Sequence, residues 1–143
     1  MSGTLFYSNI WFYAFIHRPD EDKRHEQARN LIRHSSGITV SEQVIAEVSV
    51  NLLKKGKLSE LQLARIIEAF YQRYRVLAPS LETHQIAGKL RGRYCLSYWD
   101  SLIVAAALQT DCTILYSEDM QNGLVFDEGL RIVNPLEQPR RPE

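Results

Sequence analysis

The hydrophobic positions of this chain form short apolar runs that alternate with longer amphipathic segments. Short runs rich in β-branched and aromatic residues, bounded by polar or turn residues, predict strands. These runs lie at 4–7, 37–40, 75–78, 113–116 and 130–133. Longer segments between them carry a helical repeat. Strands that alternate with helices favour an α/β fold, a three-layer α/β/α domain with a mainly parallel central sheet.

Several helix boundaries carry capping signals. Ser41 is expected to cap a helix over about 42–55, and Gly56 is expected to end it in the left-handed conformation. Ser59 with Gln62 forms a capping-box pattern that opens the next helix. The other predicted helices cover 10–16, 23–35, 80–94 and 97–109. The last of these is apolar almost all round, which predicts a buried helix.

The chain has 143 residues, enough to bury one continuous core without disulfides or a structural metal. We expect one domain over 1–136, followed by a flexible, polar and proline-containing tail over 137–143. The apolar segment 5–16 is too short to span a bilayer and has neither a basic leader nor a cleavage site. We therefore expect no membrane segment and no signal peptide.

Charge and cysteine content exclude few functions, but the cysteines indicate a cellular compartment. The 17 basic residues balance the 17 acidic ones, so no global charge indicates nucleic acid, although a local basic face stays possible. Cys95 and Cys112 lack the spacing of a metal site and the density of a disulfide scaffold, which favours reduced thiols in a cytoplasmic protein. No glycine-rich phosphate loop or nucleophile elbow is present, which argues against P-loop and serine hydrolase chemistry.

Three carboxylates stand out as candidate chemistry. Asp100 lies in the first turn of the apolar helix, where an uncompensated charge costs several kcal/mol. Glu47 lies at the edge of an apolar helix stripe, and Asp119 follows the strand at 113–116. Each alone has an ordinary explanation as a helix charge, a surface acid or a turn residue. Because strand carboxyl ends meet at one edge of a parallel sheet, together they predict a site for Mg²⁺ or Mn²⁺ that hydrolyses phosphodiesters.

The segment 98–136 carries a specific resemblance. Its stretches "WDSLIVAAAL", "ILYSEDMQNG" and "IVNP" resemble the carboxyl-terminal half of the PIN-domain ribonucleases, in particular the toxins of VapBC-type toxin–antitoxin pairs. A looser resemblance covers nearly the whole chain. It implies a PIN-like fold, Mg²⁺- or Mn²⁺-dependent endoribonuclease activity on RNA, a homodimer and a small cognate antitoxin. The antitoxin's disordered tail would fold into the acidic cleft and place an arginine on the carboxylates.

The resemblance also assigns roles to individual residues. The positions that correspond to the family's site are three metal-coordinating acids, a hydroxyl and an amide: Glu47, Asp100, Asp119, Ser117 and Asn9. The family pattern opens with the aspartate of an Asp-(Thr/Ser)-Asn motif, but this chain has "YSN", with Tyr7 in the aspartate's place. A neutral phenol is bulkier than a carboxylate and binds Mg²⁺ poorly. We therefore expect the nuclease to be impaired or inactive in this chain.

Several alternatives stay open from the sequence. The tyrosine is either natural in a degenerate member or a replacement that protects the host from an active ribonuclease. The rival function is a non-catalytic PIN-like module that binds RNA or an antitoxin. A phospho-accepting receiver domain would need paired acids after the first strand, and "YSN" has none. Basic groups that either follow an RNA backbone or only end helices are Lys54, Lys55, Lys57, Arg73, Arg75, Arg91 and Arg93.

Overall fold

The computed structural model describes residues 3–19 and 22–136, so the predicted tail at 137–143 lies outside the described residues. The strands of the sheet are β1 (Gly3–Phe6), β2 (Ile38–Ser41), β3 (Arg75–Leu77), β4 (Cys112–Tyr116) and β5 (Arg131–Val133). The helices found in the described ranges are α1 (Ser8–Phe15), α2 (Asp22–His34), α3 (Glu42–Lys54), α4 (Glu60–Arg73), α5 (Leu81–Arg93) and α6 (Tyr98–Gln109). Their order confirms the predicted alternation of strands and helices.

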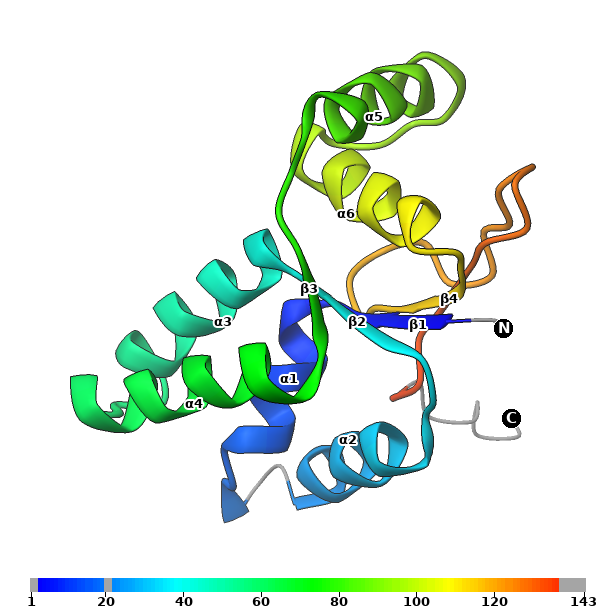
Figure 1. Cartoon of the computed structure of the whole chain (residues 1–143). Helices are drawn as coiled ribbons and strands as arrows, with labels where there is room; N and C mark the ends of the chain where they lie inside the picture. The colour runs from blue at the N-terminus through cyan, green and yellow to red at the C-terminus, as the bar shows by residue number, and fades with distance from the viewer. Residues whose placement is uncertain (1–2, 20–21, 137–143) are drawn as a thin grey trace, which may run out of the picture.

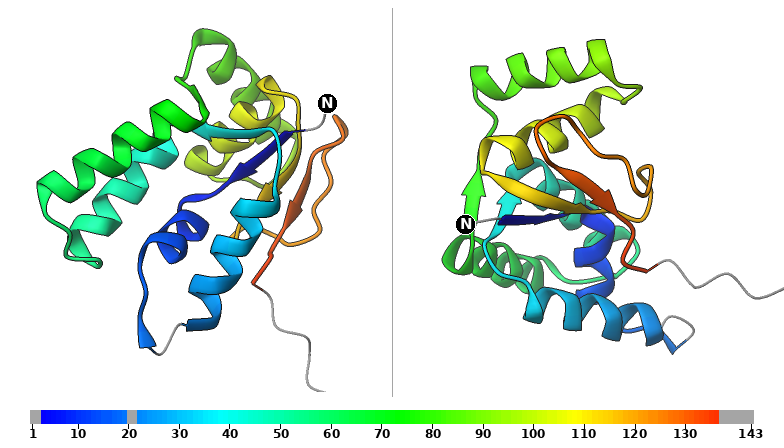
Figure 2. Two further views of the ribbon diagram at one scale, coloured as in Figure 1. Left: turned by 60° about the horizontal axis from the view of Figure 1, so that its bottom comes forward. Right: turned by 90° about the vertical axis from the view of Figure 1, so that its right-hand side faces the viewer.

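All five strands are parallel and lie in the order β3-β2-β1-β4-β5. Helices α5 and α6 cover one face of the sheet, and α1 to α4 lie on the other face (Figure 1, Figure 2). The predicted three-layer α/β/α arrangement is confirmed. Strand β1 is central and buried along its whole length, as expected for a strand with neighbours on both sides and helices above and below.

Helix α6 is the most deeply buried helical segment of the described chain. Every residue from Ser101 to Ala107 is buried, between α5 on one side and β2 and β4 on the other. Tyr98 and Trp99, at its amino-terminal end, are exposed. A helix buried all round cannot shift without opening the core, so its first turn has a fixed place. None of the helices in residues 3–19 and 22–136 is long and apolar enough to cross a membrane.

The predicted caps are present at the helix starts. The hydroxyl of Ser41 accepts a hydrogen bond from the backbone N–H of Gln43, and Ser59 forms the expected capping box with Gln62. Satisfying the free N–H groups of a first turn stabilises a helix by about 1 kcal/mol. These caps fix where α3 and α4 begin, and with that the place of the side chains that α3 contributes to the cleft.

The end of α3 differs from the sequence expectation. The left-handed conformation, with a φ of 55°, belongs to Lys57 and not to Gly56. Gly56 is instead required by space, because a Cβ atom there would lie 2.8 Å from both the carbonyl oxygen of Leu52 and the Cδ1 atom of Ile16. Glycine at this position therefore allows the end of α3 to pack against the segment that follows α1.

We predict that Gly56→Ala lowers the free energy of unfolding by about 1–3 kcal/mol, the usual result of overpacking. Gly92→Ala is the matched control, because nothing lies within 4 Å of a Cβ atom built at this position in α5. Alanine there should be neutral or stabilise by up to about 1 kcal/mol, since it favours helix. Urea unfolding of both variants and the parent measures the difference. Equal stability of Gly56→Ala and the parent would contradict the packing argument.

Candidate active site

The parallel sheet brings three segments of the chain to one edge. Phe6 at the end of β1 pairs with Tyr116 at the end of β4, and the backbone N–H of Tyr7 continues the ladder by donating to the Tyr116 carbonyl over 2.9 Å. Strand β2 ends beside β1 at the same edge, and α3 starts there. The segments after β1, β2 and β4 therefore meet at the same edge of the sheet, the edge at which ligands bind in α/β folds.

Tyr7 lies among the three predicted acids, which we call the acid cluster: Glu47, Asp100 and Asp119. Its hydroxyl donates a hydrogen bond to Oδ1 of Asp100 over 3.3 Å. Burial, and after it the negative charges of all three acids, raise the pKa of the Tyr7 phenol well above its ordinary value of about 10. At neutral pH the phenol is therefore uncharged, and it acts as a hydrogen-bond donor to the cluster.

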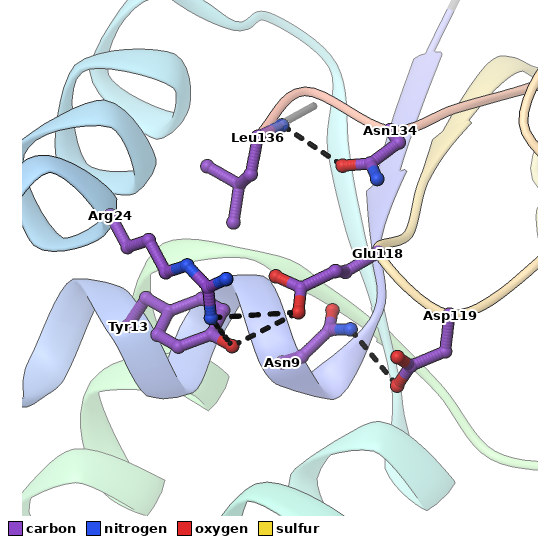
Figure 3. Close-up of polar contacts among 7 residues, drawn as sticks. All are labelled: Asn9, Tyr13, Arg24, Glu118, Asp119, Asn134 and Leu136. Atoms are coloured by element: carbon purple, nitrogen blue, oxygen red, sulfur yellow. Dashed lines mark hydrogen bonds and ion pairs between the residues drawn. The ribbon is translucent and has the colours of Figure 1, made fainter. Parts of the chain in front are cut away.

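The two residues after Tyr7 hold the other two acids. Ser8 Oγ donates to Oε2 of Glu47 over 3.0 Å. Asn9 Nδ2 donates to Oδ2 of Asp119 over 3.3 Å, as Figure 3 shows. Every residue of the "YSN" segment thus contacts a different member of the acid cluster. The pairs are Tyr7–Asp100, Ser8–Glu47 and Asn9–Asp119.

Ser117 is fully buried beneath the loop that follows β4. Its hydroxyl accepts a hydrogen bond from the backbone N–H of Met120 over 3.2 Å. That contact closes a tight turn around Asp119. Ser117 therefore shapes the loop that carries an acid, and a direct part in orienting the reacting groups stays a prediction.

Glu118, for which no role was predicted, links this loop to two helices. Its Oε1 atom accepts a hydrogen bond from the Tyr13 hydroxyl over 3.2 Å and lies 3.7 Å from the Arg24 guanidinium (Figure 3). Arg24 also donates to the Tyr13 hydroxyl over 2.9 Å. The three side chains link α1, α2 and the loop after β4, and burial followed by the charge of Glu118 raises the pKa of Tyr13.

Two residues of the cleft were not predicted from the sequence. Ser8 positions Glu47, and its signal was its place inside the "YSN" segment. Gln43 Nε2 lies 3.5 Å from Oε1 of Glu47 and 3.4 Å from the backbone oxygen of Trp99, so it links α3 to α6. The signal for Gln43 was its position one helical turn before Glu47.

Comparison with known proteins identifies the family. A model of the PIN domain matches residues 8–122. The chain belongs to the PIN-domain family. This confirms the family resemblance and the fold that the sequence predicted. No curated protein sequence matches the chain significantly.

Solved structures with the same fold include proteins of toxin–antitoxin pairs. A toxin–antitoxin complex from Klebsiella pneumoniae matches with a TM-score of 0.73 and 20% identity, covering 95% of this chain and 100% of that chain. Mycobacterium tuberculosis VapC20, a sarcin–ricin loop cleaving toxin, matches with a TM-score of 0.63 and 16% identity over 79% and 87%. DNA-bound VapBC from Salmonella typhimurium matches with a TM-score of 0.62 and 15% identity over 92% and 97%. At these identities the likeness shows the fold alone.

The acid cluster of this PIN domain fits a divalent cation in its chemistry but not in its arrangement. Carboxylate and amide oxygens are the ligands that Mg²⁺ and Mn²⁺ prefer. Among residues 3–19 and 22–136, however, no three carboxylate, imidazole or thiol groups come close enough together to hold a metal ion. The Tyr7 phenol lies among the acids and donates to Asp100. The role of the three acids as metal ligands therefore stays a prediction.

The raised pKa of Tyr7 predicts a specific dependence of stability on pH. Folding favours the protonated phenol, so this contribution is fully present below about pH 10, the pKa of the unfolded chain, and is lost as the pH rises towards the folded-state pKa. Between these limits the free energy of unfolding should fall more steeply for the parent than for Tyr7→Phe, which has no phenolic proton. Urea unfolding at a series of alkaline pH values checks this. Equal slopes would show that Tyr7 ionises freely.

Proposed function

We propose that this PIN domain is the toxin of a VapBC-type pair, a cytoplasmic Mg²⁺- or Mn²⁺-dependent endoribonuclease whose activity Tyr7 impairs. The observation that carries the proposal is the contact of each "YSN" residue with a different member of the acid cluster. Three acids from distant parts of the chain are thereby held at the carboxyl edge of the sheet, where α/β folds bind ligands. Unrelated surface acids are not expected to accept hydrogen bonds from three consecutive residues of one segment.

The protein's own groups would prepare the site for RNA hydrolysis. Ser8 and Asn9 orient two of the acids, and the buried helix α6 fixes the third, Asp100. The three carboxylates are the residues that would hold a divalent cation, and such an ion would supply an activated water and charge stabilisation of the leaving oxygen of a phosphodiester. An aspartate in place of Tyr7 would add a fourth carboxylate to the same cleft. The chemistry expected of the family thus depends on one position of this chain.

Tyr7 opposes that chemistry in two ways. Its hydroxyl donates to an Asp100 oxygen that a cation would need, and its raised pKa keeps it from becoming an anionic ligand. Both effects weaken the binding of a cation, so the parent chain should cut RNA poorly or not at all.

The decisive change is Tyr7→Asp. We expect this variant to bind Mn²⁺ more tightly than the parent by calorimetry and to cut total RNA with Mg²⁺ or Mn²⁺. Cutting should disappear with a chelator or with a second change, Asp100→Asn. The matched control is Tyr7→Phe, which removes the hydroxyl without adding a carboxylate and should gain no activity.

Three outcomes would change the proposal. Strong cutting by the parent would show that Tyr7 does not impair the site. No cutting by a well-folded Tyr7→Asp, across several RNAs, would favour the non-catalytic module that binds RNA or an antitoxin. Equal Mn²⁺ binding by Tyr7→Asp and its Asp100→Asn derivative would remove Asp100 from the metal site.

A second surface supports the proposed antitoxin partner. A groove of about 540 Å³ lies between α1, α2 and α4. Its apolar lining includes Trp11, Phe15, Ile66, Phe70 and Tyr74. Three arginines also line it, Arg29, Arg33 and Arg73, and the indole N–H of Trp11 has no hydrogen-bond acceptor among the described residues. We propose that an amphipathic, acidic segment of the antitoxin binds here, because its charge complements the arginines.

This proposal predicts that Ile66→Glu abolishes capture of the antitoxin, the small protein that a neighbouring gene should encode. Leu61→Glu is the matched control, since Leu61 is 64% exposed on the same helix and does not line the groove. Co-purification of the two chains after co-expression measures the effect. Equal capture by both variants, or a lone monomer with no small protein encoded nearby, would contradict it. The arginine in the acidic cleft and the homodimer stay further expectations for such a complex.

A further inference from the structure

A separate pocket of about 470 Å³ lies beside the acid cluster, between α3 and the first turn of α6. We call it the base pocket, and its lining residues are Gln43, Ala46, Glu47, Val50, Asn51 and Trp99. Glu47 belongs to both the pocket and the acid cluster. Any group that fills the pocket therefore lies beside the acid cluster. Its volume is within the range of pockets that bind small molecules.

The exposure of Trp99, in the wall of this pocket, is not explained by packing of the fold. Trp99 is 61% exposed, although α6 is buried from Ser101 to Ala107. Its backbone oxygen accepts a hydrogen bond from Gln43, so the main chain is anchored while the ring stays open to solvent. The Tyr98 ring meets the indole edge-to-face at 5.3 Å, and the Arg91 guanidinium lies 4.9 Å from the centre of the Tyr98 ring. An open aromatic face thus lies near a positive charge and beside the acids.

We propose that the base pocket holds one unpaired base of the RNA chain, stacked on Trp99. This inference rests on the proposed function and adds to it a residue, Trp99, that positions the RNA chain beside the acid cluster. Stacking on an aromatic ring accepts every base because each has a π-face. The Asn51 amide offers a donor and an acceptor to the edge of the base, and the side-chain oxygen of Gln43 offers a second acceptor. Trp99 is then a positioning residue for the nuclease.

RNA fits this surface better than a protein partner does. The core of a protein interface is depleted of charged residues, whereas this pocket has a carboxylate and two amides in its wall. Glu47 also belongs to both the pocket lining and the acid cluster. A base within a duplex is covered on both faces by its neighbours, so only an unpaired base can enter.

The first test measures RNA affinity of the parent chain with Mg²⁺ present, using an unstructured single-stranded RNA and a fully paired duplex. Trp99→Ala should weaken binding of the single strand by about tenfold or more, the loss of one stacked base. Trp99→Phe should keep most of the affinity, because it retains an aromatic face. Leu81→Ala, which shortens another exposed apolar side chain outside the pocket, should change nothing. Trp99 is exposed, so its replacement opens no core.

A second readout reports stacking directly. The chain has two tryptophans, of which Trp11 is 2% exposed and Trp99 is 61% exposed. Single-stranded RNA should quench the emission of the parent, because a stacked base contacts the Trp99 indole. In Trp99→Phe the RNA should still bind, but the emission of the remaining Trp11 should not change. A purely structural role of Trp99 would produce no such pattern.

The outcomes separate this inference from the proposed nuclease. Unchanged affinity and unquenched emission, or no binding of single-stranded RNA by the parent and by Tyr7→Asp, would overturn the base pocket. Dissociation of a dimer by Trp99→Ala at unchanged RNA affinity would also overturn it and assign this face to a second copy.

Cutting by Tyr7→Asp with the same KM after Trp99→Ala would remove the base pocket alone. Trp99-dependent binding by a Tyr7→Asp chain that never cuts would support the pocket and remove only the nuclease.

Discussion

The parallel pairing of β1 between β2 and β4 is the constraint on which the cleft depends. Because all three strands run the same way, the chain leaves each of them at the same edge of the sheet. The pairing of Phe6 with Tyr116 then sets how far Tyr7 projects towards the loop after β4. A slip of one residue would turn the side chains of β1 to the opposite face and separate "YSN" from its acids. The chemistry of the cleft is thus a property of strand register.

Much of this arrangement could be predicted from the sequence, because it follows from local rules. The capping residues fixed the helix starts, the apolar character of 97–109 predicted burial of α6, and the order of elements predicted parallel strands. The pairwise contacts could not be predicted, since Ser8–Glu47 and Gln43–Trp99 depend on how packed elements meet. The role of Gly56 was predicted wrongly. Glycine can be required either by a left-handed backbone conformation or by a lack of space for a Cβ atom, and only the neighbouring atoms distinguish the two.

Tyr7 also stabilises the acid cluster, an effect that a comparison with aspartate alone would not show. Carboxylates gathered in one cleft repel each other unless a cation or a hydrogen-bond donor compensates them. The phenol provides such a donor to Asp100, as Ser8 and Asn9 do for the other two acids. In this chain the cluster is therefore compensated by the protein itself. A fourth carboxylate would trade that internal compensation for dependence on an ion, a common balance between stability and activity.

The contacts of Glu118 make one side of the acid cluster different from the other. Tyr13 and Arg24 on one side, with Asn9 holding Asp119, fasten the loop after β4 to α1 and α2. That wall cannot swing outward unless several contacts break at once. The opposite wall, where α3 meets the start of α6, ends in the exposed Trp99. The two flanks of the acid cluster therefore differ in how they are held: hydrogen bonds and an ion pair fasten one, and an exposed aromatic ring ends the other.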